Sequence, residues 1–270
     1  MKRVNRFPAI FLSAALIASQ FLPVSSLAAG TVIDTSTAAA GYFTVAYQTA
    51  NAKMKVGVTQ GSDTVYYDYV PGTTSSYTFT DGDGDYTITL YRNVSGTSYR
   101  QVESAKVQVE MEDAMAPYLA STAEITFSQD DAVGQTAAQL CAGLTDDGAK
   151  VAAIHNYIAS RYTYDHDFAA RIDRGEVTNY TPDTNRLLSA QKGICYDFSA
   201  LFAAMCRSQG IPCAVAKGYL SGGYHAWNMV YVDGVWNAVD MTRSIARGNT
   251  GAAGLSGCVT SLDGYYGYAW

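Results

Sequence analysis

The sequence predicts an α+β chain in which a small all-β domain precedes a domain that mixes helices with an antiparallel hairpin. Three patterns carry this prediction. Apolar and polar residues alternate with a period of two between about residues 40 and 112. Apolar residues recur at helical spacing over 146–162 and 195–206, and an Asp-Gly turn joins two alternating segments over 224–239.

The all-β domain is expected over residues 30–115. Alternation is cleanest over 86–91 and 106–111, and clusters of Gly, Pro and Asp separate about seven short strands. Such strands without a helix are typical of a small β-sandwich, and we expect an immunoglobulin-like arrangement. The Asp-Gly-Asp-Gly-Asp segment at 81–85 offers carboxylates to calcium, but it lacks the glutamate of a calcium-binding loop. A solvated hairpin turn is therefore the better interpretation of this segment.

Residues 1–29 have the three parts of a secretory signal peptide. Basic residues precede the mostly apolar stretch 7–24, and small residues end the segment at Ala29. The apolar stretch is short for a membrane span and contains Pro23, and no later segment reaches about 18 uninterrupted apolar residues. We therefore expect a secreted or cell-surface protein whose mature chain has no membrane span.

Composition and charge exclude several classes of protein. The chain is 48% apolar and 16% charged, so it can bury a core. Its net charge of −6 argues against nucleic acid as a partner. The five cysteines form no Cys-x-x-Cys pair, so we expect no metal site. A secreted chain could pair four cysteines and leave one thiol free, and the pairing stays open among Cys141, Cys206, Cys213 and Cys258.

Two segments lead from the all-β domain to the residues that carry chemistry. The apolar spacing over 146–162 predicts a helix with Thr145 or Asp146 as its N-cap. His155 lies on or beside the apolar stripe of this helix, so we expect it to pack rather than to catalyse. Residues 163–190 are polar and show no strong period, which predicts a long loop.

Cys195 opens the next predicted helix. The apolar stripe of that helix recurs at i, i+3, i+4, i+7 and i+8 from Phe198, and Gly210 and Pro212 end it. The partial positive charge at a helix N-terminus favours a thiolate over a thiol. A thiolate at this position suits a nucleophile in acyl transfer, while a structural or disulfide-bonded cysteine is the alternative.

A predicted hairpin follows, with Asp233-Gly234 as a type I′ turn. If Val232 faces Val235 in this hairpin, His225 and Asp240 share one face and lie diagonally, within side-chain reach. A slip of one residue would send them to opposite faces. A carboxylate so placed can hold the imidazole in one tautomer and orient it toward a thiol, while a packed strand histidine is the alternative.

These motifs resemble the transglutaminase-like superfamily over about residues 118–245. The resemblance rests on Gly-Ile-Cys-Tyr-Asp-Phe-Ser at 193–199, Gly-Ile-Pro-Cys at 210–213, His-Ala-Trp-Asn at 225–228 and Asp-Met-Thr at 240–242. It implies a papain-like α+β domain over 116–270, in which the nucleophile helix packs against an antiparallel sheet. It further implies Cys195 as nucleophile, His225 as general base and acid, and Asp240 as orienting carboxylate, without a cofactor. The tail over 246–270 matches no motif.

The implied enzyme is a cysteine peptidase or amidase that hydrolyses amide bonds in a protein or peptide, such as a cell-wall peptide or surface protein. The backbone N–H of Cys195 is expected in the oxyanion hole, and Gln191, four residues upstream, is a candidate for a second donor. Attack of a lysine amine on the acyl-thioester would instead make a cross-linking transglutaminase. A non-catalytic surface binding or scaffold protein is the third possibility. The sequence leaves the substrate, the acyl acceptor and the oligomeric state open.

Overall fold

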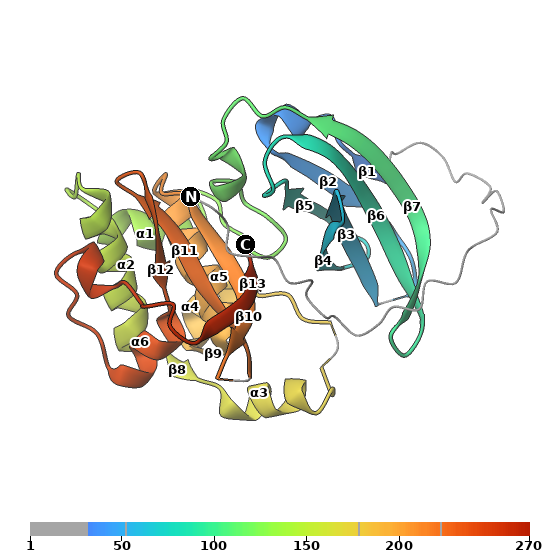
Figure 1. Ribbon diagram of the computed structural model, residues 1–270. Helices are drawn as coiled ribbons and strands as arrows, with labels where there is room; N and C mark the ends of the chain where they lie inside the picture. Colours follow the sequence, from blue (N-terminus) through green and yellow to red (C-terminus); the bar gives the residue numbers. More distant parts are fainter. Residues whose placement is uncertain (1–31, 52, 178, 222) are drawn as a thin grey trace. The chain divides into compact units, whose positions relative to one another are not determined.

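The described part of the chain consists of two compact units (Figure 1). The computed structural model describes residues 32–51, 53–177, 179–221 and 223–270. The first unit ends at Ala114 and the second begins at Met115. The predicted signal peptide lies outside the described residues. Within those residues, every helix is too short or too polar to cross a membrane.

Two antiparallel sheets form the first unit, with the strand orders β1-β2-β5 and β4-β3-β6-β7. Its strands are β1 (Ile33–Asp34), β2 (Tyr42–Ala46), β3 (Met54–Gln60), β4 (Asp63–Tyr69), β5 (Thr74–Thr78), β6 (Gly84–Ser95) and β7 (Ser98–Val109), and η1 (Ala38–Ala40) is a 3-10 helix. The prediction of an N-terminal region built from β-sheets is confirmed. Its immunoglobulin-like arrangement stays a prediction.

Aromatic side chains connect the two sheets of this unit. The ring centroid of Phe79 lies 5.1 Å from that of Phe43 in β2 and 4.8 Å from that of Tyr86 in β6. Tyr77 of β5 lies 5.4 Å from Tyr67 of β4. Because β2 and β5 belong to one sheet and β4 and β6 to the other, these contacts form a shared core.

The acidic segment 81–85 is not a hairpin turn. It connects β5 to β6, which belong to different sheets, so that prediction is wrong. The Asp83 carboxylate accepts a hydrogen bond of 2.8 Å from the N–H of Met111. A Gly- and Asp-rich turn looks the same in sequence whether it joins paired strands or crosses between sheets.

The second unit combines helices with a four-stranded antiparallel sheet of the order β12-β11-β10-β13, and α5 packs against β10 and β11 (Figure 1). Its elements are η2 (Ala116–Tyr118), α1 (Ala132–Leu140), α2 (Asp147–Arg161), β8 (Thr163–Tyr164), α3 (His166–Asp173), α4 (Thr184–Ala190), β9 (Lys192–Gly193), α5 (Cys195–Ser208), β10 (Cys213–Leu220), β11 (Gly223–Val232), β12 (Val235–Val239), α6 (Met241–Arg247), η3 (Leu255–Gly257) and β13 (Tyr265–Ala269). The prediction of an α+β chain is confirmed.

Aspartates are the N-cap residues of α1, α2, α3, α4 and α6. Asp146 is the N-cap of α2, as predicted, and its carboxylate accepts a hydrogen bond of 2.7 Å from the N–H of Ala149. Asp165 and Asp183 cap α3 and α4 in the same way. The predicted loop over 163–190 is therefore wrong. No residue of α3 is fully buried, and its apolar spacing is limited to Phe168 and Ile172, which is too short a pattern to predict a helix.

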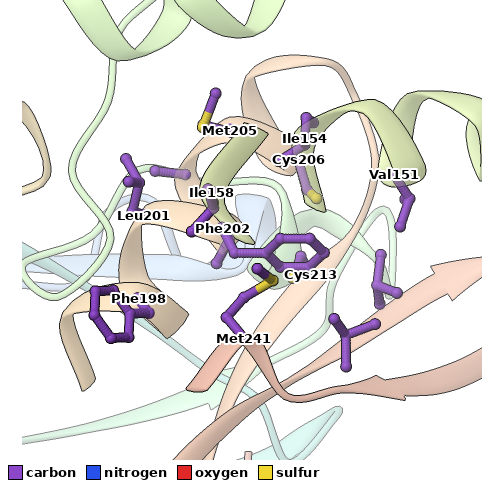
Figure 2. Close-up of a cluster of buried hydrophobic side chains, with 14 of the residues drawn as sticks. Val151, Ile154, Ile158, Phe198, Leu201, Phe202, Met205, Cys206, Cys213 and Met241 are labelled. Carbon is purple, nitrogen blue, oxygen red and sulfur yellow. The ribbon is translucent and has the colours of Figure 1, made fainter. Parts of the chain in front are cut away.

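The apolar stripe of α5 lies at the centre of the second unit (Figure 2). Its members are all fully buried, as the helical spacing predicts: Phe198, Leu201, Phe202, Met205 and Cys206. Figure 2 shows them gathered with Val151, Ile154 and Ile158 of α2 and with Met241 of α6. This packing holds the N-terminus of α5, and with it Cys195, at a defined place on the sheet.

The hairpin of β11 and β12 has the predicted register. Val232 pairs with Val235, and Asn228 pairs with Val239. The side-chain amide of Asn228 donates a hydrogen bond of 2.9 Å to the carbonyl of Ser199 in α5, which attaches the hairpin to the helix. The two faces pack separately: Trp227, Met229 and Ala238 lie in one cluster, and Ala226, Val230 and Val239 lie in the cluster that contains α5.

All five cysteines lie within the described residues and have free thiols. Cys141, Cys206, Cys213 and Cys258 are buried, whereas Cys195 is partly exposed. The structure therefore assigns none of the disulfide pairings that the sequence left open.

Candidate active site

Cys195 is the first residue of α5, directly after its N-cap residue Ile194. The buried carboxylate of Asp197 fixes this turn, because it accepts hydrogen bonds from the N–H of Ile194, at 2.9 Å, and from the hydroxyl of Tyr180. A Cβ atom at Gly193 would lie only 2.9 Å from the Cβ of Asp197, so glycine permits the close approach. Cys195 is thereby held at a helix N-terminus, where the N–H groups favour an anion.

His225 and Asp240 are joined by a hydrogen bond of 2.9 Å between Nε2 and Oδ2. His225 lies near the start of β11. Asp240 directly follows β12 and is the N-cap of α6, where its Oδ1 accepts a hydrogen bond of 3.1 Å from the N–H of Arg243. Asp240 has no exposed surface. The carboxylate therefore has one oxygen that caps a helix and one that binds the imidazole.

The hydrogen bonds of His225 determine its charge. Burial by itself lowers the pKa of His225, but hydrogen bonds with Asp240 and with Cys195 outweigh it and raise the pKa to about 9. Burial acts to raise the pKa of Asp240, yet the hydrogen bond and charge of His225 hold it below its ordinary value. At neutral pH the pair is therefore an imidazolium and a carboxylate.

The structure brings Cys195, His225 and Asp240 into one chain of contacts. Because Nε2 of His225 faces Asp240, the nitrogen left for Cys195 is Nδ1. A nucleophile, a base and a group that orients the base are the parts that covalent acyl transfer needs.

Tyr265 also contacts the carboxylate of Asp240, and no sequence motif points to it. Its hydroxyl donates a hydrogen bond of 2.6 Å to Oδ2 of Asp240. Its ring centroid lies 4.8 Å from that of Trp227, a fully buried residue of the core. Tyr265 begins β13, which the unmatched tail over 246–270 contributes to the sheet. No local pattern could have identified it, since only the pairing of β13 with β10 brings it to the site.

Gln191 lies in the turn between α4 and β9 and is exposed. It has a left-handed φ of 52°, and its carbonyl oxygen accepts a hydrogen bond of 3.0 Å from the N–H of Thr163. The backbone of Gln191 thus helps to hold β8 beside β9. A role for its side chain in an oxyanion hole stays a prediction.

A charged cluster that no sequence motif indicates borders Cys195. Glu124 accepts hydrogen bonds from Nζ of Lys217 and from the hydroxyl of Tyr196, the residue that follows Cys195. Nζ of Lys217 lies 4.4 Å from the ring centroid of Tyr196. Long-range packing creates this cluster, because Glu124 lies 72 residues from Tyr196 along the chain. Among the residues that the structure describes, no group of His, Cys, Asp and Glu is arranged to hold a metal ion.

Comparisons with known proteins find similarity to one family model and to two curated relatives. Residues 134–241 match the model of the transglutaminase-like superfamily. Kyphoscoliosis peptidase from Mus musculus is 35% identical over 105 residues, which cover 34% of this chain and 15% of the relative. The Homo sapiens protein of the same name matches with the same identity and coverage. The chain thus spans about 15% of the length of these curated relatives.

Solved structures are similar at lower levels. A crystal structure of a TGase is 28% identical, with a TM-score of 0.34, and the match covers 41% of this chain and 30% of that chain. A candidate cysteine protease from Cytophaga hutchinsonii is 19% identical, with a TM-score of 0.44, and the match covers 83% of this chain and 73% of that chain. The segment that matches the family model includes Cys195, His225 and Asp240. Residues 134–241 of this chain are therefore similar to the transglutaminase-like superfamily.

Proposed function

We propose that this protein is a secreted cysteine-dependent enzyme that hydrolyses amide bonds of a protein or peptide through an acyl-thioester. One observation carries the proposal: His225 is hydrogen-bonded to the buried carboxylate of Asp240 and lies close enough to Cys195 for that side chain to raise its pKa. The family match and the name peptidase of the curated relatives support hydrolysis of a peptide. Secretion rests on the signal-peptide pattern of residues 1–29.

The first half of the reaction forms the thioester. The thiolate of Cys195 attacks the carbonyl carbon of the substrate amide, and negative charge moves to the carbonyl oxygen. The backbone N–H of Cys195, which has no partner within the helix, is placed to donate to that oxygen. His225 then transfers its Nδ1 proton to the leaving nitrogen. The C–N bond breaks, an amine leaves, and the acyl group stays on Sγ.

The second half of the reaction releases the acid. Neutral His225 takes a proton from water while the water oxygen attacks the thioester carbon. The C–S bond then breaks, so Cys195 returns to the thiolate and His225 to the imidazolium. Asp240 holds the imidazole in one orientation through both halves. A lysine amine in place of water would give the cross-linking reaction with the same residues.

A pH series of iodoacetamide alkylation tests the proposed nucleophile. Adducts are mapped by mass spectrometry between pH 5 and pH 9, and the four buried cysteines serve as internal references. We expect Cys195 alone to react quickly below pH 7, and His225→Ala to lose this reactivity. His166→Ala is the matched control, because His166 is an exposed residue of α3. If Cys195 reacts only near the ordinary thiol pKa of about 8.5 and independently of His225, the proposal is wrong.

A second assay identifies the acyl acceptor. The protein is incubated with a mixture of unfolded proteins, with and without a labelled primary amine, and the products are read by mass spectrometry. New chain termini that are absent with Cys195→Ser indicate hydrolysis. Amine adducts without new termini would replace the hydrolytic proposal with transamidation.

A further inference from the structure

One oxygen of Asp240 has two donors. Oδ2 accepts a hydrogen bond of 2.9 Å from Nε2 of His225 and one of 2.6 Å from the hydroxyl of Tyr265. Asp240 is fully buried and Tyr265 is 7% exposed, so little water competes for these bonds. Hydrogen bonds to an ionised carboxylate are among the stronger ones in proteins. The tyrosine hydroxyl therefore takes up part of the negative charge that faces the imidazolium.

The surroundings of Tyr265 aim its hydroxyl at Asp240. The guanidinium of Arg243 donates a hydrogen bond of 3.2 Å to the same hydroxyl, which leaves the phenolic proton for the carboxylate. Burial raises the pKa of Tyr265, so the hydroxyl stays protonated and acts as a donor. The ring centroid of Tyr265 lies 4.8 Å from that of Trp227 and 6.2 Å from that of His225.

The close approach of β13 to β10 depends on Gly218. A Cβ atom at this position would lie 2.6 Å from Cβ of Tyr268 and 2.9 Å from the carbonyl oxygen of Tyr266. Real structures essentially never show such short contacts. Two separate features thus hold Tyr265 against Asp240. Gly218 in β10 lets β13 approach closely, and the ring of Tyr265 packs against Trp227.

We propose that Tyr265 is a positioning residue of the candidate triad: its hydroxyl anchors Oδ2 of Asp240 and shares the negative charge of that carboxylate. The C-terminal strand, which lies beyond the residues matched by the family model, then completes the site. This inference rests on the proposed function.

The role follows from the charge changes of the reaction. When His225 gives its proton to the leaving amine, Asp240 keeps its charge in a buried place without an imidazolium beside it. An ionised carboxylate in such a place needs other donors. The neutral imidazole still donates its Nε2–H, and the hydroxyl of Tyr265 and the N–H of Arg243 are the further donors. Tyr265 therefore stabilises the state in which His225 is neutral.

The groups that face this titration come from α5, α6, β8, β11 and β13 and from the loop before α1. Asp240 and Cys195 act on His225 directly, Tyr265 and Arg243 act through Asp240, and Tyr164, Tyr224 and Glu124 border Cys195 or its neighbours. Among them, the Tyr265 hydroxyl can be removed by Tyr265→Phe while the ring stays in place. Without this hydroxyl, His225 is the only side chain among the described residues that donates to Oδ2 of Asp240, so the pKa of His225 should rise.

A histidine titration by NMR tests the proposal without any substrate. The chain has three histidines. In Tyr265→Phe we expect the pKa of His225 to rise by about 0.5 to 1 unit, because a charge-assisted hydrogen bond is removed from its partner. In a peptide assay, kcat should fall roughly 3- to 10-fold with KM unchanged, since one pKa unit is a factor of ten in proton affinity. Asp240→Asn should shift the pKa of His225 the opposite way.

Controls separate this role from a loss of folding. Tyr266→Phe removes the hydroxyl of the neighbouring residue, which is 54% exposed, and should leave the pKa of His225 unchanged. His155 is fully buried and bonds through Nε2 to Ser244 at 2.8 Å, so its signals report the fold in every variant. If Tyr265→Phe does not fold, Arg243→Met serves instead. It removes the guanidinium that donates to the Tyr265 hydroxyl, at a partly exposed position, and should raise the pKa of His225 by a smaller amount.

The outcomes divide between the two proposals. If His225 of the unmodified protein titrates near its ordinary pKa of about 6.5, the ion pair is absent and both proposals are overturned. If that pKa is raised but Tyr265→Phe leaves it unchanged or lowers it, the positioning role is overturned and the proposed function stands. A rise in Tyr265→Phe that Tyr266→Phe does not show supports the role.

Discussion

Replacing Asp240 with asparagine tests whether the carboxylate and His225 are coupled in the folded protein. The substitution removes the negative charge but keeps an oxygen that can cap α6, since asparagine is a good N-cap residue. The change should therefore leave the fold intact and remove the attraction that holds the proton on His225.

The structure sets the size and sign of the effect. The pKa of His225 rises from 6.5 to about 9, and one unit corresponds to about 1.4 kcal/mol, so the stabilisation is about 3 kcal/mol. The His225 side chain is only 12% exposed, so solvent screens this interaction little. Because the folded pKa lies above the unfolded one, the stabilisation is complete below about pH 6.5 and is lost as pH rises through about 9.

Urea unfolding between pH 6 and pH 9.5 measures this effect. All three tryptophans, Trp227, Trp236 and Trp270, lie in the second unit, so tryptophan fluorescence reports that unit alone. The difference in the free energy of unfolding between the unmodified protein and Asp240→Asn should be largest at pH 6. It should shrink toward pH 9.5 by the share of the roughly 3 kcal/mol that comes from Asp240, since Cys195 also raises the pKa of His225.

Asp233→Asn is the matched control, because Asp233 lies exposed in the turn between β11 and β12. Its pH profile should run parallel to that of the unmodified protein. If the profile of Asp240→Asn is parallel as well, His225 and Asp240 are not coupled in the folded state, and the assigned charge state of the site is refuted.

Three further substitutions test the fold that supports the site. Phe202→Ala empties the centre of the α5 core and should lower the free energy of unfolding in urea by about 3–5 kcal/mol, and a loss below 1 kcal/mol would contradict the packing. Asp146→Ala removes the N-cap of α2 and should lower it by about 1 kcal/mol, whereas no change would show that the cap contributes nothing. Gly218→Val should push β13 away from β10 and reduce peptide hydrolysis and amide-exchange protection in β13, and unchanged protection would refute the close approach.

Local patterns in the sequence were sufficient for the central helix and the hairpin. The large apolar residues from Phe198 to Cys206 recur with a period of 3.6, which predicted α5 although the helix is buried on all sides from Asp197 to Ser208. The period of two and the Asp-Gly turn set the register of β11 and β12. The same register predicts that His225 and Asp240 share a face, and in the structure Nε2 of His225 lies 2.9 Å from Oδ2 of Asp240.

Elements with little buried surface escaped the same reasoning. The segment over 163–190 looked like a loop because α3 buries no residue, and its aspartate caps were the signal that could have revealed it. The acidic segment at 81–85 was wrongly predicted to be a hairpin turn, because the residues of a turn do not indicate to which sheet the next strand belongs.

The sequence by itself determined the second unit's central helix, its hairpin, and the order of the Cys, His and Asp motifs, because each of these depends on residues that are close along the chain. Only the tertiary structure decided that Tyr265 binds the carboxylate of Asp240 and that Glu124 contacts Lys217 and Tyr196 beside Cys195. Those contacts join residues far apart in sequence. They form only when β13 pairs with β10 and the sheet packs on α5, and no periodicity within one segment encodes such a pairing.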